Sequence, residues 1–259
     1  MVNAQIHARP WQDAQGSKST VWVVEIAHAG KLNAMTRSMW RQLRDVFETI
    51  QRDPQVRCVL VQGQGEAFCA GGDISEYPAF RFEAATLEAF HEEDVWGGLK
   101  AMLDCDVPVV ANISGACMGA GVEIASCCDV RLVADSAVFG APIAKLGFPM
   151  APKELQLVAA SVGMHTAKRM LLEAQIFSAH QMAAAGWCAP PLAATELAQQ
   201  VIRTVERIAG LAPQAARLNK QAMRQLAHGQ IPSDPYAYAP SAEHREGVSA
   251  FLAKRPAHF

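Results

Sequence analysis

Two short segments rich in small residues carry the strongest chemical signal in this chain. The first spans residues 68–73 (Phe-Cys-Ala-Gly-Gly-Asp) and the second spans residues 115–123 (Gly-Ala-Cys-Met-Gly-Ala-Gly-Val-Glu). Turns of small residues leave backbone N–H groups open to a ligand, and two such groups that converge on one carbonyl oxygen stabilise negative charge on it. The two segments together therefore indicate an oxyanion hole, in which an enolate can form from a carbonyl compound.

Glu123 is the candidate acid/base group beside this hole. It lies three residues beyond Ala120, so on a helix the two residues share a face and the carboxylate can point into the same cavity. A carboxylate between two apolar residues is costly to bury without a purpose, whereas an acid/base catalyst benefits from a raised pKa. The alternative interpretation is a capping or salt-bridging glutamate in the first helical turn.

The two segments resemble motifs of the crotonase superfamily, the enoyl-CoA hydratase/isomerase family. The first follows the family pattern F-x-A-G-x-D, and the second follows G-x-x-x-G-G-G-x-E with alanine at the middle glycine of the triplet. Single glycine turns are common, so the order and spacing of several matches carry the resemblance. The other matching stretches cover nearly the whole chain and are residues 31–35, 139–142, 146–149, 246–251 and 254–256.

The resemblance implies a role for each site residue. The amides of Ala70 and Ala120 would form the oxyanion hole, and Glu123 would move a proton. Alanine at position 120 keeps the main-chain donor that the family's glycine supplies. The residues implied to contact the coenzyme A part of the substrate are Lys31, Ala70, Gly71, Gly72, Asp73, Ile74 and Ala120.

Position 143 departs from the family pattern. Enoyl-CoA hydratases use a second glutamate after the proline of F-G-x-P-E, and this chain has Ile143 there. A hydrophobic side chain can neither accept a hydrogen bond from water nor carry its proton, so we expect poor hydration of crotonyl-CoA unless another residue holds the water. The possible substitutes, most of which are expected to face solvent, are His91, Glu92, Glu93, Asp94, Lys145 and Glu154.

Enoyl-CoA hydratase is therefore the leading function that the resemblance implies. The alternatives are a double-bond isomerase with a single glutamate base and a non-catalytic acyl-CoA-binding protein. A decarboxylase or a thioester hydrolase is a weaker possibility. The coenzyme A thioester would be the substrate, with no permanently bound cofactor and no metal.

Composition limits the partners and the cellular location. The net charge of −2 gives no basic field for a nucleic acid, and no apolar run approaches the roughly 20 residues of a membrane-spanning helix. With no leader-like N-terminus, we expect a cytoplasmic protein. The seven cysteines are odd in number and scattered, which is typical of reduced, buried residues. A nucleophilic Cys69 or Cys117 beside the hole is the alternative.

Strands that alternate with helices must position the two segments. Runs of β-branched and apolar residues predict strands at residues 21–26, 58–61, 108–113 and 129–134. Helical spacing predicts helices from Thr36 to the Asp53-Pro54 pair, over residues 83–103, and from Gly119 onwards. The hole segments then follow the carboxyl ends of strands, where ligands commonly bind.

The last quarter of the chain has a different sequence pattern. After Pro190-Pro191 the pattern is almost wholly helical, over residues 193–209, 212–227 and 241–254. We predict an α/β fold with a boundary near residue 190, and the resemblance implies a crotonase-type spiral of ββα units over residues 1–190. The C-terminal helical region, residues 191–259, would build a homotrimer or a dimer of trimers, because its apolar helix faces need another surface.

Overall fold

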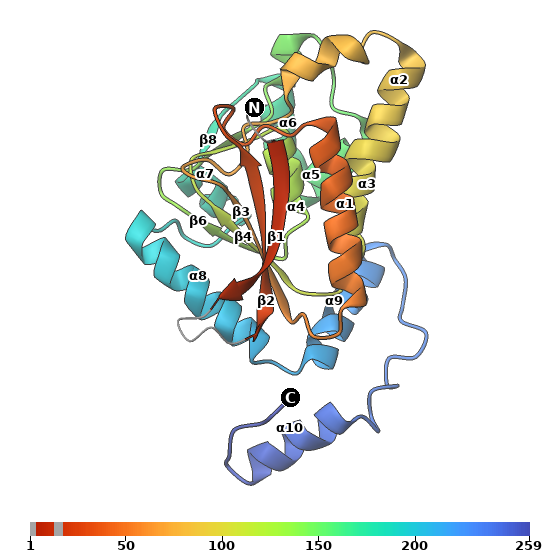
Figure 1. Cartoon of the computed structure of the whole chain (residues 1–259), viewed down its shortest axis with the longest axis vertical. Coiled ribbons are helices and arrows are strands. Elements are labelled where there is room, and N and C mark those ends of the chain that lie inside the picture. The colour runs from red at the N-terminus through yellow and green to blue at the C-terminus, as the bar shows by residue number, and fades with distance from the viewer. Residues whose placement is uncertain (1–3, 13–17) are drawn as a thin grey trace.

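The larger of two β-sheets forms the centre of the chain. The computed structural model describes residues 4–12 and 18–259 (Figure 1). The sheet has the order β1-β2-β3-β4-β6, with β1 antiparallel to β2 and the other neighbours parallel. Its strands are β1 (Ala4–Gln12), β2 (Lys18–His28), β3 (Cys58–Gly63), β4 (Val109–Ile113) and β6 (Val130–Val133). The strands predicted from β-branched runs are confirmed, and parallel strands of this kind are buried on both faces.

A second, smaller sheet stacks the short segments that follow these strands. It contains β5 (Ala116–Met118), β7 (Val138–Gly140) and β8 (Phe177–Ser178), in that order. Single bridges extend it from Cys117 to Cys69 and from Gly72 to Met35. Successive repeats of the chain thus add one strand to the larger sheet and one short segment to the smaller sheet. This is the spiral that we expected.

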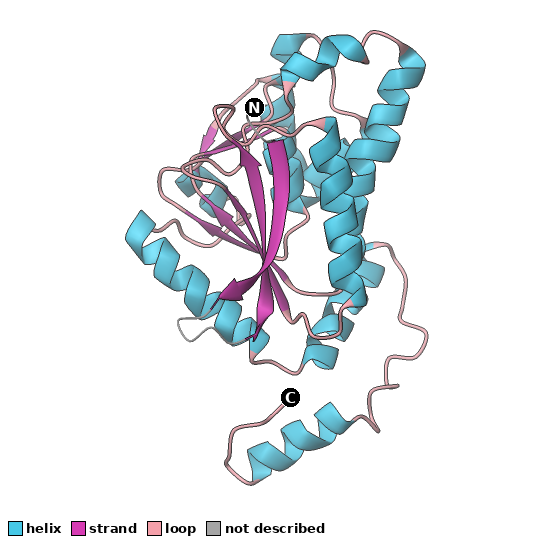
Figure 2. Ribbon diagram, in the orientation of Figure 1, coloured by secondary structure: helices cyan, strands magenta, loops and turns pink. Residues whose placement is uncertain are grey.

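Helices cover both faces of the larger sheet (Figure 2). The first, α1 (Arg37–Arg52), has Thr36 as its N-cap and Asp53 as its C-cap, which confirms both predicted ends. Its buried side packs with α3 (Trp96–Asp104). The helices that complete this side of the molecule are α2 (Ala84–Ala89), α4 (Ala120–Ser126), α5 (Pro152–Val162), α6 (Met164–Leu172) and α7 (Ala179–Ala184).

The helical stretch predicted over residues 83–103 is confirmed, but it is not a uniform α-helix. The chain forms α2, then a π-helical turn over Phe90–Val95, and then α3. The wider turn directs Asp94 inward, where its carboxylate accepts hydrogen bonds from Arg37 Nε at 2.7 Å and Arg41 Nε at 2.6 Å. Such π-turns are frequent at functional sites, and this one borders the cavity described below.

The C-terminal region begins with a helix that belongs to the core. Helix α8 (Ala194–Ala209) lies on the face of the sheet opposite α1 (Figure 1) and buries Leu197, Val201 and Val205 against it. We had expected this apolar face to need another subunit, and that expectation was wrong because the sheet of the same chain covers it.

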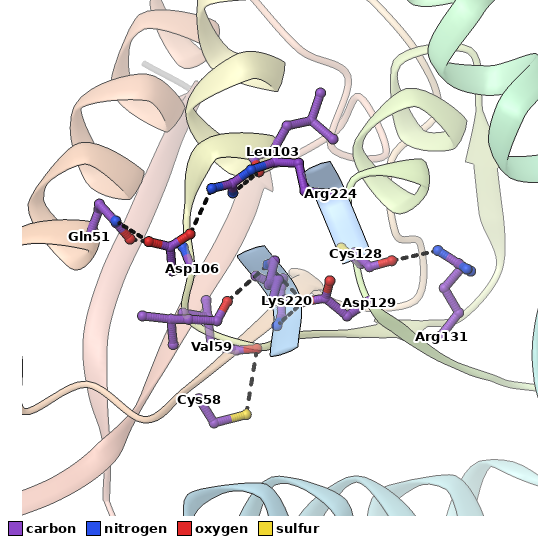
Figure 3. A network of polar contacts seen from close by, with 12 residues as sticks. Gln51, Cys58, Val59, Leu103, Asp106, Cys128, Asp129, Arg131, Lys220 and Arg224 are labelled. Carbon is purple, nitrogen blue, oxygen red and sulfur yellow. Dashed lines mark hydrogen bonds and ion pairs between the residues drawn. The ribbon is translucent and has the colours of Figure 1, made fainter. Parts of the chain in front are cut away.

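Helix α9 (Pro213–Ala227) is held to the core by a polar network (Figure 3). The Lys220 amine donates to the Val107 carbonyl at 2.9 Å and pairs with Asp129 at 2.7 Å, while Arg224 pairs with Asp106 at 2.8 Å. Helix α10 (Ala242–Leu252) stands apart from the body of the chain in Figure 1. The boundary near residue 190 stays a prediction. Across the described residues, none of the helices combines the length and apolarity that crossing a bilayer requires.

Candidate active site

The two hole segments lie side by side, as the sequence predicts. The Cys69 amide donates to the Ala116 carbonyl at 2.9 Å, and the Met118 amide donates to the Cys69 carbonyl at 2.8 Å. Gly121 permits this approach, because a Cβ there would lie 2.5 Å from the Cys69 carbonyl oxygen. Residues nearly fifty positions apart therefore border one cavity.

Ala70 does not have the free amide that we predicted for it. Its N–H donates to the Leu32 carbonyl at 2.9 Å, so it is unavailable to a ligand. The Met35 amide donates to the Gly71 carbonyl, and the Met35 carbonyl accepts a hydrogen bond from the Asp73 amide, both at 2.8 Å. The intervening Gly72 amide must then point the opposite way, toward the cavity that Gly72 lines, and within the described residues it has no backbone acceptor.

The second candidate donor is Ala120, the first residue of α4. Gly119 precedes it with φ 47°, a conformation that favours glycine. The first amides of a helix have no acceptor within the helix, and Ala120 lines the same cavity as Gly72. Gly72 and Ala120, instead of Ala70 and Ala120, are therefore the candidate pair of amide donors at this cavity.

The cavity between these amides and the π-turn has a volume of about 350 Å³. Its walls are mostly apolar, with contributions from Val95, Met118 and Phe148. Polar groups are few, as is typical of pockets that take small molecules. The titratable residues on its walls are Tyr77, Arg81, His91, Glu123, Lys145 and Glu154.

Glu123 faces this cavity from the first turn of α4. Burial, together with the nearby Glu154 carboxylate, raises the pKa of Glu123 from 4.5 to about 8. The carboxyl group is thus protonated at neutral pH and can give a proton to a carbon atom beside it. The geometry favours the acid/base interpretation over a capping or salt-bridging glutamate.

A second carboxylate, Glu154 of α5, lines the same cavity. Only 2% of its surface is exposed, and its Oε1 lies 2.9 Å from His91 Nδ1. Most of the possible substitutes were expected to face solvent, and Glu154 is an exception because it occupies the apolar side of α5 with Val158 and Val162. A buried carboxylate beside another acid is a costly arrangement that is typical of active sites.

Of the other possible substitutes for a second glutamate, Asp94 is buried, whereas Glu92, Glu93 and Lys145 are exposed. Asp94 is buried but is bound by Arg37 and Arg41 outside the cavity. Glu92 and Glu93 are exposed, as expected, and Glu92 pairs with Lys153. Lys145 is exposed at the cavity edge, and Ile143 contributes an apolar side chain to the cavity wall.

Five of the seven residues implied for coenzyme binding line the cavity, and Lys31 and Asp73 do not. The Lys31 amine contacts Asp73 Oδ1 at 2.8 Å and Ser75 Oγ at 2.7 Å. Burial alone would raise the pKa of Asp73, but the bonds from Lys31 and Ser75 outweigh it and lower that pKa. Ile74 is exposed and lines the cavity. Their contact with coenzyme A stays a prediction.

The cysteines near the hole are poor nucleophiles. Cys69 and Cys117 are fully buried, and burial raises the pKa of the Cys69 thiol to about 12 and that of Cys117 well above its usual value. Both thiols stay protonated at neutral pH. They fill space between the two hole segments, which agrees with the interpretation as small hydrophobic residues.

Sequence reasoning missed Gly72 as a donor, as well as the pairing of Glu154 with His91. The first depends on the backbone of Met35, which is distant in sequence. The second had a readable signal, because Glu154, Val158 and Val162 follow one another at four-residue spacing. A glutamate on the apolar face of an amphipathic helix is a candidate for a buried, functional group.

Comparisons with known proteins agree with this geometry. The family profile described as enoyl-CoA hydratase/isomerase matches residues 16–259. A probable enoyl-CoA hydratase of Mycobacterium bovis is 26% identical over 247 residues, which cover 92% of this chain and 94% of the relative. The crotonyl-CoA hydratase of Syntrophomonas wolfei is 28% identical over 249 residues, with coverages of 92% and 93%.

Solved structures give the same result for the fold. The crystal structure of an enoyl-CoA hydratase/carnithine racemase from Magnetospirillum magneticum matches with a TM-score of 0.89 and 33% identity, over 93% of this chain and 92% of the other. A family member from Hyphomonas neptunium matches with a TM-score of 0.88 and 26% identity, over 98% and 97%. This chain belongs to the enoyl-CoA hydratase/isomerase family and has the crotonase fold.

Proposed function

We propose that this protein adds water to the double bond of a 2-enoyl-CoA. The thioester oxygen accepts hydrogen bonds from the Gly72 and Ala120 amides, which stabilise the enolate that forms when a nucleophile attacks the β-carbon. The observation that carries the proposal is the second buried carboxylate, Glu154, in the same cavity as Glu123. It supports a two-carboxylate reaction although position 143 has no carboxylate.

The two acids have different tasks in this reaction. Glu154, oriented by His91, accepts the proton of a water molecule whose oxygen bonds to the β-carbon. Glu123, protonated at neutral pH because of its raised pKa, gives its proton to the α-carbon. The product is a 3-hydroxyacyl-CoA, and exchange with bulk water returns both carboxyl groups to their starting states.

A double-bond isomerase is the second candidate, and Ile143 favours it. The apolar side chain at this position of the cavity wall stands where the hydratase pattern has its second glutamate, and a single base that removes and returns a proton suffices for isomerisation. A non-catalytic acyl-CoA-binding protein is disfavoured, because a binder gains nothing from two carboxyl groups in one mostly apolar cavity.

Activity against crotonyl-CoA and against a 3-enoyl-CoA separates these functions. We expect turnover of crotonyl-CoA, a loss of about a hundredfold or more in kcat for Glu154→Gln and for Glu123→Gln, and little change for Glu93→Gln, since one acid/base group contributes on this scale. Conversion of the 3-enoyl-CoA alone would support the isomerase. Full hydration by Glu154→Gln would remove the second carboxylate from the mechanism.

A further inference from the structure

Arg81 places a cation in the wall of the cavity between two aromatic rings. Its guanidinium carbon lies 3.8 Å from the centre of the Phe148 ring and 4.5 Å from that of Tyr77. The rings are 6.0 Å apart at an interplanar angle of 69°. Contact with the two rings holds the guanidinium in place, and neither ring is a conventional acceptor for its N–H groups.

The other cations that stack on aromatic rings in this protein all have an acceptor. Arg37 over Phe80 pairs with Asp94, and Arg169 over Phe177 pairs with Glu173. Lys153 over Trp96 pairs with Glu92, and Arg131 over Trp187 donates to a backbone carbonyl at 2.7 Å. Within residues 4–12 and 18–259, Arg81 has no side-chain hydrogen bond or ion pair.

An unpaired guanidinium in a partly closed pocket is an unfavourable arrangement unless a ligand completes it. Arg81 is half-buried, and this burial lowers its pKa, so water shields the cation only in part. A guanidinium edge with several N–H groups matches a carboxylate, which can accept two parallel hydrogen bonds. The missing partner of Arg81 is therefore expected to be an anion on the bound ligand.

The position of Arg81 assigns this anion to the acyl chain. Arg81 stacks on Tyr77, whose hydroxyl stands over Gly72: a Cβ on Gly72 would lie 2.2 Å from that oxygen. One side chain thus separates the guanidinium from the proposed oxyanion hole. The phosphates of coenzyme A are separated from the thioester by the whole pantetheine arm, so they are too far from the oxyanion hole to be the partner of Arg81.

We propose that Arg81 binds a second carboxylate at the far end of the acyl group, so that the preferred substrates are thioesters of dicarboxylic acids. This inference rests on the proposed function, in that the cavity holds an acyl-CoA. Glu123 is compatible with an anionic chain because it is uncharged at neutral pH. Among the described residues that line the cavity, Lys145 is the other cation without a side-chain partner, but it is exposed at the edge and stacks on no ring.

The experiment compares matched substrates in wild type, Arg81→Met and Arg81→Lys. The substrates are 2-enoyl-CoA thioesters with chains of five to eight carbons, each with a terminal carboxylate or a terminal methyl group. At one chain length or more, we expect wild type to prefer the carboxylate in kcat/KM. Arg81→Met should lose about ten- to a hundredfold on that substrate alone, since one charged hydrogen-bonded contact has this effect. Arg81→Lys should recover part of the loss.

Binding measurements separate this inference from the proposed reaction. Saturated thioesters, such as glutaryl-CoA and valeryl-CoA, need no chemistry, and calorimetry gives their affinities for wild type and Arg81→Met. We expect tighter binding of the carboxylated member of a pair, lost in Arg81→Met, even if no 2-enoyl-CoA is hydrated. Equal affinities in wild type at every chain length would overturn the proposal. So would an equal loss on both members of each pair, which would assign Arg81 to coenzyme A or to packing.

Discussion

Replacement of Glu123 by glutamine should change how the stability of this protein depends on pH. The pKa of Glu123 is raised by burial and by Glu154 to about 8, from an ordinary value of 4.5. Between these values the folded protein keeps a proton that the unfolded chain releases. The free energy of unfolding of wild type therefore falls as the pH rises through this window. Glutamine has the same shape and no proton to lose, so the variant lacks this contribution.

The size of the effect follows from the two pKa values. Below about pH 4.5 both states of wild type are protonated, and above about pH 8 both are ionised. Each pH unit between these limits lowers the free energy of unfolding by about 1.4 kcal/mol. From pH 5 to pH 8, the stability of wild type relative to Glu123→Gln should fall by about 3 to 4 kcal/mol.

Urea denaturation followed by tryptophan fluorescence measures this difference. Both proteins are compared at one protein concentration, because association of subunits would add a concentration-dependent stabilisation. Glu88→Gln is the matched control, since Glu88 of α2 is exposed and has no side-chain partner among the described residues. Its stability relative to wild type should not vary with pH. A flat difference for Glu123→Gln as well would refute a raised pKa at Glu123 and, with it, the role of Glu123 as a neutral acid.

Three further outcomes test other parts of the structure. The rate of hydration should fall above about pH 8 as Glu123 ionises, and a rate that rises through pH 9 would contradict its role as an acid. Lys220→Met should lower the free energy of unfolding by about 2 to 3 kcal/mol, because it removes the donor of the Val107 carbonyl and the cation that pairs with Asp129; unchanged urea midpoints would count against the network in Figure 3. Phe251, which is 83% exposed on α10, should lie in a subunit interface, so light scattering should give a trimer or hexamer for wild type and smaller species for Phe251→Asp. A monomeric wild type at micromolar concentration would exclude that interface.

The elements with a strong local signal were predictable from the sequence. Thr36 caps α1 with its side chain, and Asp53-Pro54 ends the helix, so both boundaries are set by neighbouring residues. The short strands β5 and β7 have only three residues each. Their pairing depends on segments that are distant in the sequence, and no pattern of residues within them distinguishes a strand from a glycine-rich turn.

The site was predictable in part, for a related reason. Glu123 and Ala120 are close in sequence and share a helix, so their common direction follows from helical geometry. The free amide of Gly72 depends instead on Met35, which occupies the neighbouring backbone groups. Glu154 reaches the cavity from α5, and Arg81 reaches it from the turn that precedes α2. The sequence spacing of either residue from Glu123 does not indicate this.

The substitution at position 143 illustrates how far a motif can determine a mechanism. A motif gives the position of a residue in the sequence, whereas proton transfer depends on where the carboxyl group lies relative to the substrate. Ile143 removes a carboxylate from the wall that follows β7, and Glu154 supplies one from α5 in the same cavity. Poor hydration of crotonyl-CoA was expected because of Ile143, and it no longer follows once Glu154 is buried there. Since His91 holds that carboxylate at 2.9 Å, the turnover of Glu154→Gln tests this mechanism more directly than a glutamate introduced at position 143.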